Sequence, residues 1–390
     1  FIGARPCPAT RSPVAPGHDD LGQAVGEADQ REHPDHRGGG RHVDHLRRLQ
    51  EATRSWGEAT AAAVEDTFTQ QGQEPALGRA AASDWAEAVP ATYRADYEVE
   101  NAVEDIAIFE SLTETKPAAV RCAEGDGETR LKTYLSDAHT LTELLPVMQN
   151  MGMVVVDQKP YDITPADGRS FLLYDFGVTL PEGVVPDEVA DLYEDALNAY
   201  LLGKRESDSL DRLILAEKLS WEQIRIFRAY THYLLQLGRG FTAEFMSDTL
   251  LDYPKATALL ARYFDVSFNP AADFDSQDAR EQAREDVWAQ LGAVLDAIPT
   301  LDVDRFMRSL ATVMAATLRT NAYMGRDSLA LKVSPQQIDF APLPRPLYEI
   351  FVYSRRVEGV HLRFGSIARG GLRWSDRRED FRTEVLGLVK

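Results

Sequence analysis

The spacing of hydrophobic and polar positions changes several times along the chain, and each change predicts a different kind of element. From Leu46 to about Leu112, apolar side chains recur near every 3.6 residues in Ala- and Glu-rich stretches. This period is typical of amphipathic helices, and Ser83 is a suitable N-cap for the second helical stretch. We therefore expect a run of structural helices in this part of the chain.

Between residues 130 and 180 the pattern becomes mixed. TLTELLPVMQNMG (140–152) is amphipathic with a helical period, and Gly152 is a good C-cap. Alternating or β-branched runs on either side predict strands, with a PADG turn between the last two. The strands are RLKTYL (130–135), MVVVDQKPYDI (153–163) and SFLLYDFGVTL (170–180). The order strand, helix, strand, strand matches the first part of a ferredoxin-like ACT domain, a module that often binds free amino acids. Many small α+β units share this pattern.

Beyond Pro186 the chain is predicted to be helical for about 140 residues, as far as Met324. Ser220 and Gln223 form a capping box at the start of one of these helices. Five side chains share one face of that helix and indicate core packing rather than a cofactor site. They are Trp221, Phe227, Tyr230, Tyr233 and Leu234. His232, within the same helix, is expected to be partly buried or on the surface.

A proline-containing segment, APLPRPLYE, predicts a domain boundary, and two alternating runs, IFVYS and GVHLRFG, predict strands after it. The predicted fold class is α+β: an ACT-like domain, a long helical region, and the first strands and helix of an α/β domain. The expected segments are 1–45, 46–115 (helical), 116–185 (ACT-like), 186–336 (helical) and 337–390 (start of the α/β domain).

Composition narrows the class of protein. The 390 residues carry a net charge of −20, which disfavours binding to nucleic acid or to an acidic membrane. Cys7 and Cys122 have no partners at metal-ligand spacing, and a reducing compartment is expected. The chain has no apolar stretch of membrane-spanning length and no apolar core of a signal peptide. These features together predict a cytoplasmic protein.

The first 45 residues have a different composition. They contain five of the eight histidines and almost no apolar periodicity. We expect this segment to be disordered or to reflect a misassigned start. A metal-binding tract is the alternative interpretation, but no hydrophobic frame would hold its ligands in place. The candidate ligands would be His33, His36, His42, His45, Asp35 and Asp44.

The last 37 residues reverse the charge of the chain. They hold eight Arg and one Lys against five Asp or Glu, a local balance of +4. Within them, Arg369 and Arg373 flank the sequence Gly370-Gly371-Leu372. Glycines allow a backbone to approach a ligand closely, and arginine offers a planar donor fork that matches a carboxylate. This combination suits a small anion, although a Gly-Gly turn with solvated arginines would have the same sequence.

Longer stretches resemble a known family. The resemblance is carried by VEGVHLR (357–363), ARGGLRWSDRREDFRTEVLGLVK (368–390), ESDSLDRLILAEKLSWEQIRIFRAYTHYLLQ (206–236), TLLDYP (249–254), LRTNAYM (318–324), LPVMQNMGMVVVDQKPYDI (145–163), YDFGV (174–178) and RRLQEATRSW (47–56). Together these look like part of the large-type NAD-specific glutamate dehydrogenases, over residues 46–390. The 23 residues from Ala368 resemble the start of that family's catalytic domain.

The resemblance implies specific roles. Arg369 matches a basic position that holds a substrate carboxylate, although smaller members of the superfamily carry Lys there. Gly370 and Gly371 would form the turn that lines the substrate site. Arg373 would orient that loop, and Glu384 and Lys390 would lie on the following helix.

The resemblance also implies a substrate pair, L-glutamate and 2-oxoglutarate, and the cofactor NAD. The family's catalytic lysine and its Rossmann domain are not among the 390 residues, so the fragment alone is expected to be inactive. The alternative is a non-catalytic regulatory or assembly module whose ACT-like domain binds an amino-acid effector. In either case a homo-oligomer is expected for the full-length protein.

Overall fold

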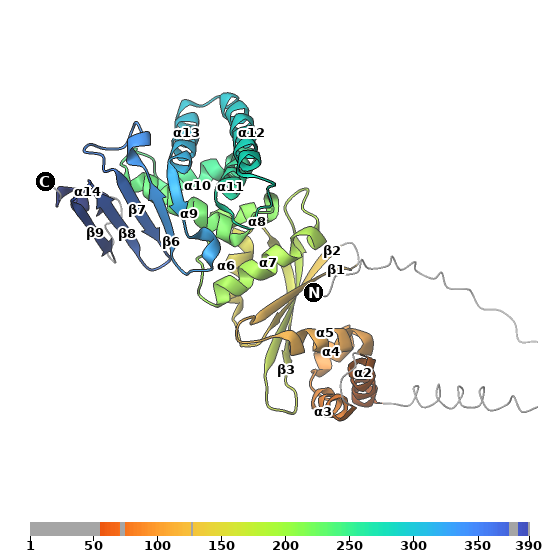
Figure 1. Cartoon of the computed structure of the whole chain (residues 1–390). Coiled ribbons are helices and arrows are strands. Elements are labelled where there is room, and N and C mark those ends of the chain that lie inside the picture. Colours follow the sequence, from red (N-terminus) through yellow and green to blue (C-terminus); the bar gives the residue numbers. More distant parts are fainter. Residues whose placement is uncertain (1–54, 71–74, 126–127, 374–380, 389–390) are drawn as a thin grey trace, which may run out of the picture. The chain divides into compact units, whose positions relative to one another are not determined.

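The structure is a computed structural model that describes residues 55–70, 75–125, 128–373 and 381–388. The described residues contain a four-stranded sheet in the order β1-β2-β4-β3 and a five-stranded sheet in the order β5-β6-β7-β8-β9. Helices pack against both sheets (Figure 1). The mixed architecture and the ACT-like unit confirm the predicted α+β class.

The chain described here begins with four helices that pack on the first sheet. They are α2 (Trp56–Gln70), α3 (Pro75–Trp85), α4 (Ala91–Asp96) and α5 (Val99–Ser111). Trp85 at the end of α3 stacks on Phe109 of α5 and on Phe171 of the sheet, with ring centroids 6.0 and 5.7 Å apart. The prediction of Ser83 as an N-cap is wrong, because Ser83 lies inside α3 and the chain leaves the helix only after it.

A buried carboxylate also joins these helices to the sheet. Asp105 of α5 accepts hydrogen bonds from Tyr93 (2.6 Å), Lys132 (2.7 Å) and Tyr134 (2.7 Å). Burial, and then Asp105, raise the pKa of the Tyr93 hydroxyl far above its ordinary value. The hydroxyl therefore stays protonated and remains a donor to Asp105.

The first sheet has a ferredoxin-like arrangement with one unexpected strand. Its elements are β1 (Ala118–Gly125), β2 (Glu128–Leu135), α6 (Leu141–Asn150), β3 (Val154–Ile163), β4 (Phe171–Thr179) and α7 (Pro186–Leu201). The predicted run from β2 to β4 is confirmed, and Gly152 after α6 adopts φ +89°, as a helix C-cap requires. Strand β1 was not predicted. It precedes the run and fills the edge position beside β2, where the last strand of a ferredoxin-like unit would lie.

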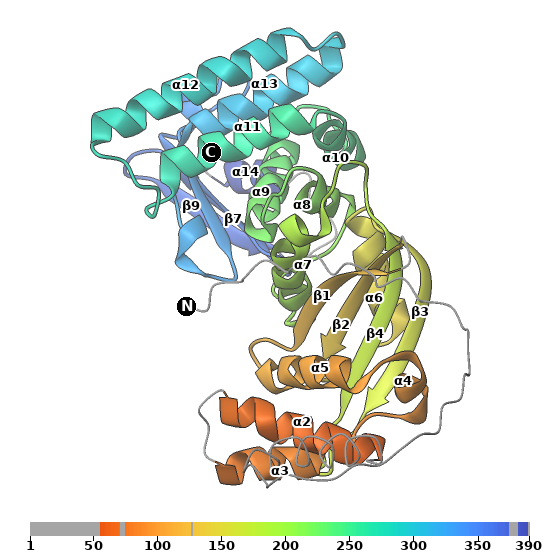
Figure 2. The ribbon, with the colours of Figure 1, turned by 90° about the vertical axis from the view of Figure 1, so that its right-hand side faces the viewer.

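Both faces of this sheet are buried. Along β4, Leu172 and Tyr174 contact the core that includes α6 and α7, whereas Phe171 and Leu173 contact the core of α2–α5. Successive strand residues point to opposite faces, so the α6–α7 layer covers one face and the α2–α5 layer the other. Figure 2 shows these two layers on either side of the strands. This explains why β4 is a nearly continuous hydrophobic run.

The helical region that follows is built around one buried helix. Its elements are η1 (Ser209–Asp211), α8 (Arg212–Ala216), α9 (Trp221–Gln236), α10 (Ala243–Asp252), α11 (Pro254–Phe268), α12 (Gln277–Asp296) and α13 (Leu301–Ala315). The Ser220–Gln223 capping box at the start of α9 is confirmed. Phe227, Tyr230, Tyr233 and Leu234 are buried, which confirms these four core positions, whereas Trp221 is only partly buried and lines a cavity.

An ion network attaches this helical region to the second sheet. Arg228 of α9 donates two hydrogen bonds of 2.8 Å to Asp208 and one of 2.9 Å to Asp211. Arg205 donates to Asp211 at 2.7 Å, and Tyr353 of β7 donates to Glu206. Because the charges are paired and hydrogen-bonded, the cost of burying the two arginines is offset.

The Asp208–Arg228 pair predicts acid sensitivity. Burial alone would raise the pKa of Asp208, but the hydrogen bonds and charge of Arg228 lower it overall. A depressed carboxyl pKa stabilises the fold above the ordinary value of 3.8, and this contribution is lost as the pH falls below that value. We expect D208N to remove part of the loss of unfolding free energy below pH 4, measured by urea unfolding across pH. An unchanged slope in D208N would contradict this assignment.

The second sheet begins earlier than the sequence predicted. Its elements are β5 (Thr317–Thr320), β6 (Leu329–Val333), β7 (Tyr348–Tyr353), β8 (Glu358–Arg363) and β9 (Ala368–Arg373), followed by α14 (Phe381–Gly387). The predicted strands at 350–354 and 359–365 are confirmed as β7 and β8. The helix predicted to run to Met324 instead ends at Ala315, and the proline-containing segment lies between two strands of one sheet.

Further predictions from the sequence concern a membrane span and a metal site. Within the described residues no helix is long and apolar enough to cross a bilayer, and no His, Cys, Asp and Glu cluster is suited to a metal. The histidine tract, Cys7 and Lys390 lie outside the described residues.

Candidate functional site

The Arg-Gly-Gly-Leu-Arg block forms an edge strand rather than a turn. Residues 368–373 make β9, which pairs antiparallel with β8: Arg369 lies opposite Leu362, Gly370 opposite His361, and Gly371 opposite Val360. The expected Gly-Gly turn is therefore wrong. The reversal of the chain occurs earlier, at Gly365, whose φ of +95° favours glycine.

The two glycines have different neighbours. A Cβ on Gly370 would lie 2.8 Å from the carbonyl oxygen of Val360 and 3.2 Å from the Cα of His361, so the position requires glycine. A Cβ on Gly371 would meet only Phe381, at 3.7 Å, which is an ordinary contact. Gly370 thus allows β9 to lie close to β8, while Gly371 leaves space beside α14.

The alternation of side chains places Arg369 and Gly371 on the same side of β9. Opposite them, Leu362 and Val360 are buried, whereas His361 is exposed. Arg369 is exposed, and its guanidinium group donates a hydrogen bond of 2.9 Å to the backbone oxygen of Ala368. Its guanidinium group is therefore available to an external anion. The backbone of Arg373 pairs with Glu358, and its side chain lies outside the description.

The same strands line a cavity of about 390 Å³. Its lining comes from β7, β8 and β9 and includes Arg369, Gly370 and Gly371 as well as His361 and Leu372. Gly370 is exposed there, whereas Gly359 is buried beneath the side chain of Leu372. An edge strand presents unpaired N–H and C=O groups, and these can meet a carboxylate.

A buried ion pair supports this strand from behind. Arg382 of α14 donates to Glu349 of β7 through Nε (2.8 Å) and Nη2 (3.0 Å), and both residues are completely buried. The backbone N–H of Arg382 also donates to Gln236 of α9 at 2.9 Å. Burial alone would lower the pKa of Arg382, but the paired Glu349 raises it overall, so the guanidinium group stays charged. The pair fixes α14 against the sheet, and Phe381 of α14 lies beside Gly371.

A second polar contact was also not predicted. His232 of α9 lies 2.7 Å from Glu358 of β8 through Nδ1, and its ring lies 5.0 Å from that of Tyr353. Its side chain is 23% exposed, which confirms the expected partial burial. Sequence reasoning missed these partners because Arg382, Glu349, His232 and Glu358 come from distant elements. No local spacing signals such long-range pairs.

The domains of the chain match those of one class of amino-acid dehydrogenase. Residues 73–112 match glutamate dehydrogenase helical motif 2, residues 118–192 the glutamate dehydrogenase ACT3 domain, and residues 205–270 helical motif 3. Residues 290–390 match the catalytic domain of bacterial NAD-glutamate dehydrogenase. All four matches are to modules of glutamate dehydrogenases. The chain belongs to the bacterial NAD-specific glutamate dehydrogenase family.

Three curated relatives agree with these matches. The chain is 36% identical over 88% of its length to the NAD-specific glutamate dehydrogenase of Mycobacterium tuberculosis, covering 21% of that protein. It is 36% identical over 87% to that of Pseudomonas aeruginosa, covering 21%, and 38% identical over 79% to that of Halomonas elongata, covering 20%. The chain therefore spans about a fifth of the length of these relatives.

Proposed function

We propose that this chain is part of an NAD-dependent glutamate dehydrogenase, which converts L-glutamate, NAD and water into 2-oxoglutarate, ammonia and NADH. The proposal rests on the membership of the family together with one observation, the exposed Arg369 guanidinium beside Gly371 on β9. NAD would accept the hydride from the α-carbon of glutamate. No G-x-G-x-x-G sequence occurs among the 390 residues, so NAD binding is ascribed to another part of the protein.

The residues of this chain would bind the substrate rather than carry out the chemistry. We propose that Arg369 donates its planar fork to a carboxylate of glutamate, because two parallel charge-assisted hydrogen bonds give both strength and orientation. Gly370 and Gly371 supply close backbone approach, and Arg373 orients the segment that follows β9. The catalytic lysine of the family, which assists the attack of water on the iminium, is not among these residues.

The domain assignment is part of this proposal. Segments 46–115 and 186–336 would be helical motifs, 116–185 an ACT-like domain, and 337–390 the start of the catalytic domain. Strands β5 and β6 belong to the same sheet as β7, which supports a start of the catalytic domain before residue 337.

The proposal is tested with the complete protein that contains this segment. We expect L-glutamate and NAD together, but neither alone, to produce NADH in a spectrophotometric assay. Failure of the purified, folded protein to reduce NAD with glutamate would contradict the proposal.

A regulatory role of the ACT-like domain is the second candidate. The domain match and a cavity of about 330 Å³ beside β3, β4 and the start of α7 support it. The lining is neutral, however, with threonine hydroxyls as its polar side chains. Calorimetry of the 390-residue chain with free amino acids tests this effector prediction. Loss of the binding heat on substitution of Thr129 or Thr179 would support it, and a binding heat that is independent of both would contradict it.

Exposed Val154 and Val156 on the edge strand β3 support the proposal of a homo-oligomer.

A further inference from the structure

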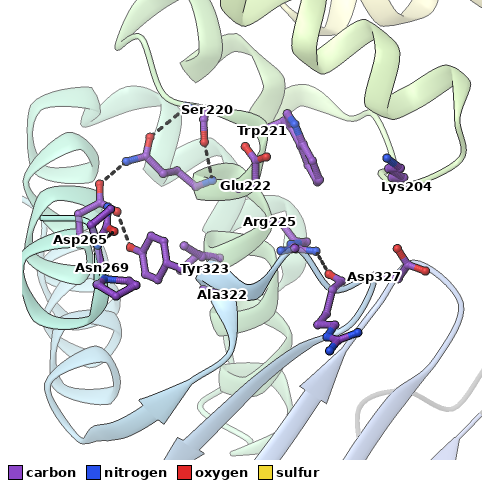
Figure 3. Close-up of a pocket in the computed structure, with 16 residues that line it drawn as sticks. Lys204, Ser220, Trp221, Glu222, Arg225, Asp265, Asn269, Ala322, Tyr323 and Asp327 are labelled. Atoms are coloured by element: carbon purple, nitrogen blue, oxygen red, sulfur yellow. Dashed lines mark hydrogen bonds between the residues drawn. The ribbon is translucent and has the colours of Figure 1, made fainter. Parts of the chain in front are cut away.

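A separate cavity of about 770 Å³ lies between the start of α9, the end of α11 and the segment that joins β5 to β6. Its volume is typical of small-molecule sites. Figure 3 shows Arg225 between Trp221 and Asp327, with Tyr323 and Asp265 on the far wall. None of the residues proposed above for glutamate lines this cavity.

Arg225 is a buried cation that has no ion-pair partner among the described residues. Its side chain lines the cavity, the residue is only 8% exposed, and its Nε is buried without a hydrogen-bond partner. Nη1 donates to the backbone oxygen of Arg326 at 2.8 Å, and no carboxylate of the described residues lies within 4.0 Å of the guanidinium nitrogens. Arg228, almost one turn later on α9, is paired with two aspartates. Burying an unpaired charge costs free energy, and an anion that enters the cavity would lower this cost by pairing with Arg225.

The aromatic walls are held in place. The Trp221 ring lies 5.4 Å from the Arg225 guanidinium carbon. Across the cavity, Asp265 accepts hydrogen bonds from Gln223 (2.5 Å) and from the hydroxyl of Tyr323. The remaining lining includes the apolar residues Ile226, Pro270, Ala271 and Ala322. These surfaces can bury the apolar body of a ligand without first reorganising.

The other charges around the cavity limit the charge of that ligand. Glu222 and Asp327 line it and act electrostatically on Arg225, and Lys204 and Arg326 contribute positive charge. The two carboxylates would repel a multiply charged anion such as phosphate. A single carboxylate avoids most of this repulsion, and an amino group beside it would be attracted by the same acids.

We propose that this cavity binds a small organic carboxylate with an apolar or aromatic body, the carboxylate on Arg225 and the body against Trp221 and Tyr323. The ligand could be a simple carboxylic acid or an amino acid, which share this chemistry. The proposal does not depend on the dehydrogenase activity, because it concerns a different cavity and is tested by binding alone.

The test is calorimetric titration of the 390-residue chain with four probes. We expect 3-phenylpropionate and L-phenylalanine to bind, and phenethylamine and inorganic phosphate not to bind. Tighter binding of L-phenylalanine would identify the amino-acid class, and tighter binding of 3-phenylpropionate the simple acids. No saturation by either carboxylate up to about 10 mM, or equal binding of phosphate, would overturn the proposal.

Substitutions of Arg225 test whether this residue binds the carboxylate. R225M should weaken carboxylate binding at least about tenfold, as expected for the loss of a charged hydrogen bond. R319M removes the same charge from exposed Arg319, which lies outside the cavity, and should bind like the wild type. R225K keeps the charge but loses the planar fork and should bind with intermediate affinity. Unchanged binding in R225M would overturn the assignment.

Thermal unfolding separates binding from a structural role. Without ligand, R225M should unfold at the same temperature as the wild type or higher, because a buried unpaired charge is removed. A marked fall in its midpoint together with unchanged carboxylate binding in R225M would show that Arg225 only supports the fold.

Discussion

R382M should destabilise the chain by about 3–5 kcal/mol, the largest effect expected of any single substitution in this account. The substitution leaves Glu349 completely buried and without its guanidinium hydrogen bonds, in a site where burial raises the pKa of its carboxyl. It also removes the charged support that holds α14 beneath β9. The measurement is urea unfolding of the full chain, followed by circular dichroism.

Two further variants make this test specific. The double variant E349M/R382M replaces both charges with apolar side chains, and it should recover most of the lost stability. Arg284 and Glu281 form an exposed pair at 2.6 Å, so R284A should cost less than about 1 kcal/mol. If R382M and R284A lower stability equally, the buried pair does not have the role assigned to it here.

The second large effect is expected at Gly370. G370A should destabilise the chain by about 2 kcal/mol, because its Cβ would meet the backbone of β8 and force the edge strand away. Neither Val360 O nor His361 Cα can rotate out of the way as the end of a side chain would. The same unfolding experiment measures the change.

G371A is the matched control, since it adds the same methyl group one residue later. The nearest atom to its Cβ would be 3.7 Å away, and alanine is no worse than glycine in a strand. We expect its stability to stay within about 0.5 kcal/mol of the wild type. Equal losses in the two variants would mean that the spacing of β8 and β9 does not depend on Gly370.

The parts of the fold with strong local signals were predictable from the sequence. The Ser220 capping box, the Gly152 C-cap and the apolar run of β4 each depend on neighbouring residues. Strand β1 was missed because AAVRCAEG has no clear alternation of apolar and polar residues, although Pro117 precedes it and Gly125 ends it. Strand β5 was missed because four residues after a helix adopt the strand only through pairing with β6.

The candidate site was predictable in composition but not in conformation. Two adjacent glycines favour a turn by local propensity, but pairing with β8 places them in a strand. The supporting pair Arg382–Glu349 is 33 residues apart, and the pair His232–Glu358 is 126 residues apart. Such contacts are set by tertiary packing, so no motif in the sequence indicates them.

The central claim, that β9 forms a wall of the glutamate site, is tested most directly by the KM for L-glutamate of R369M in the complete enzyme. We predict a rise of about tenfold or more with the KM for NAD unchanged, because a charged hydrogen bond to a substrate carboxylate is lost. R319M, which removes an exposed arginine on β5, should keep both values. A KM for glutamate that is the same in R369M and the wild type would contradict the claim.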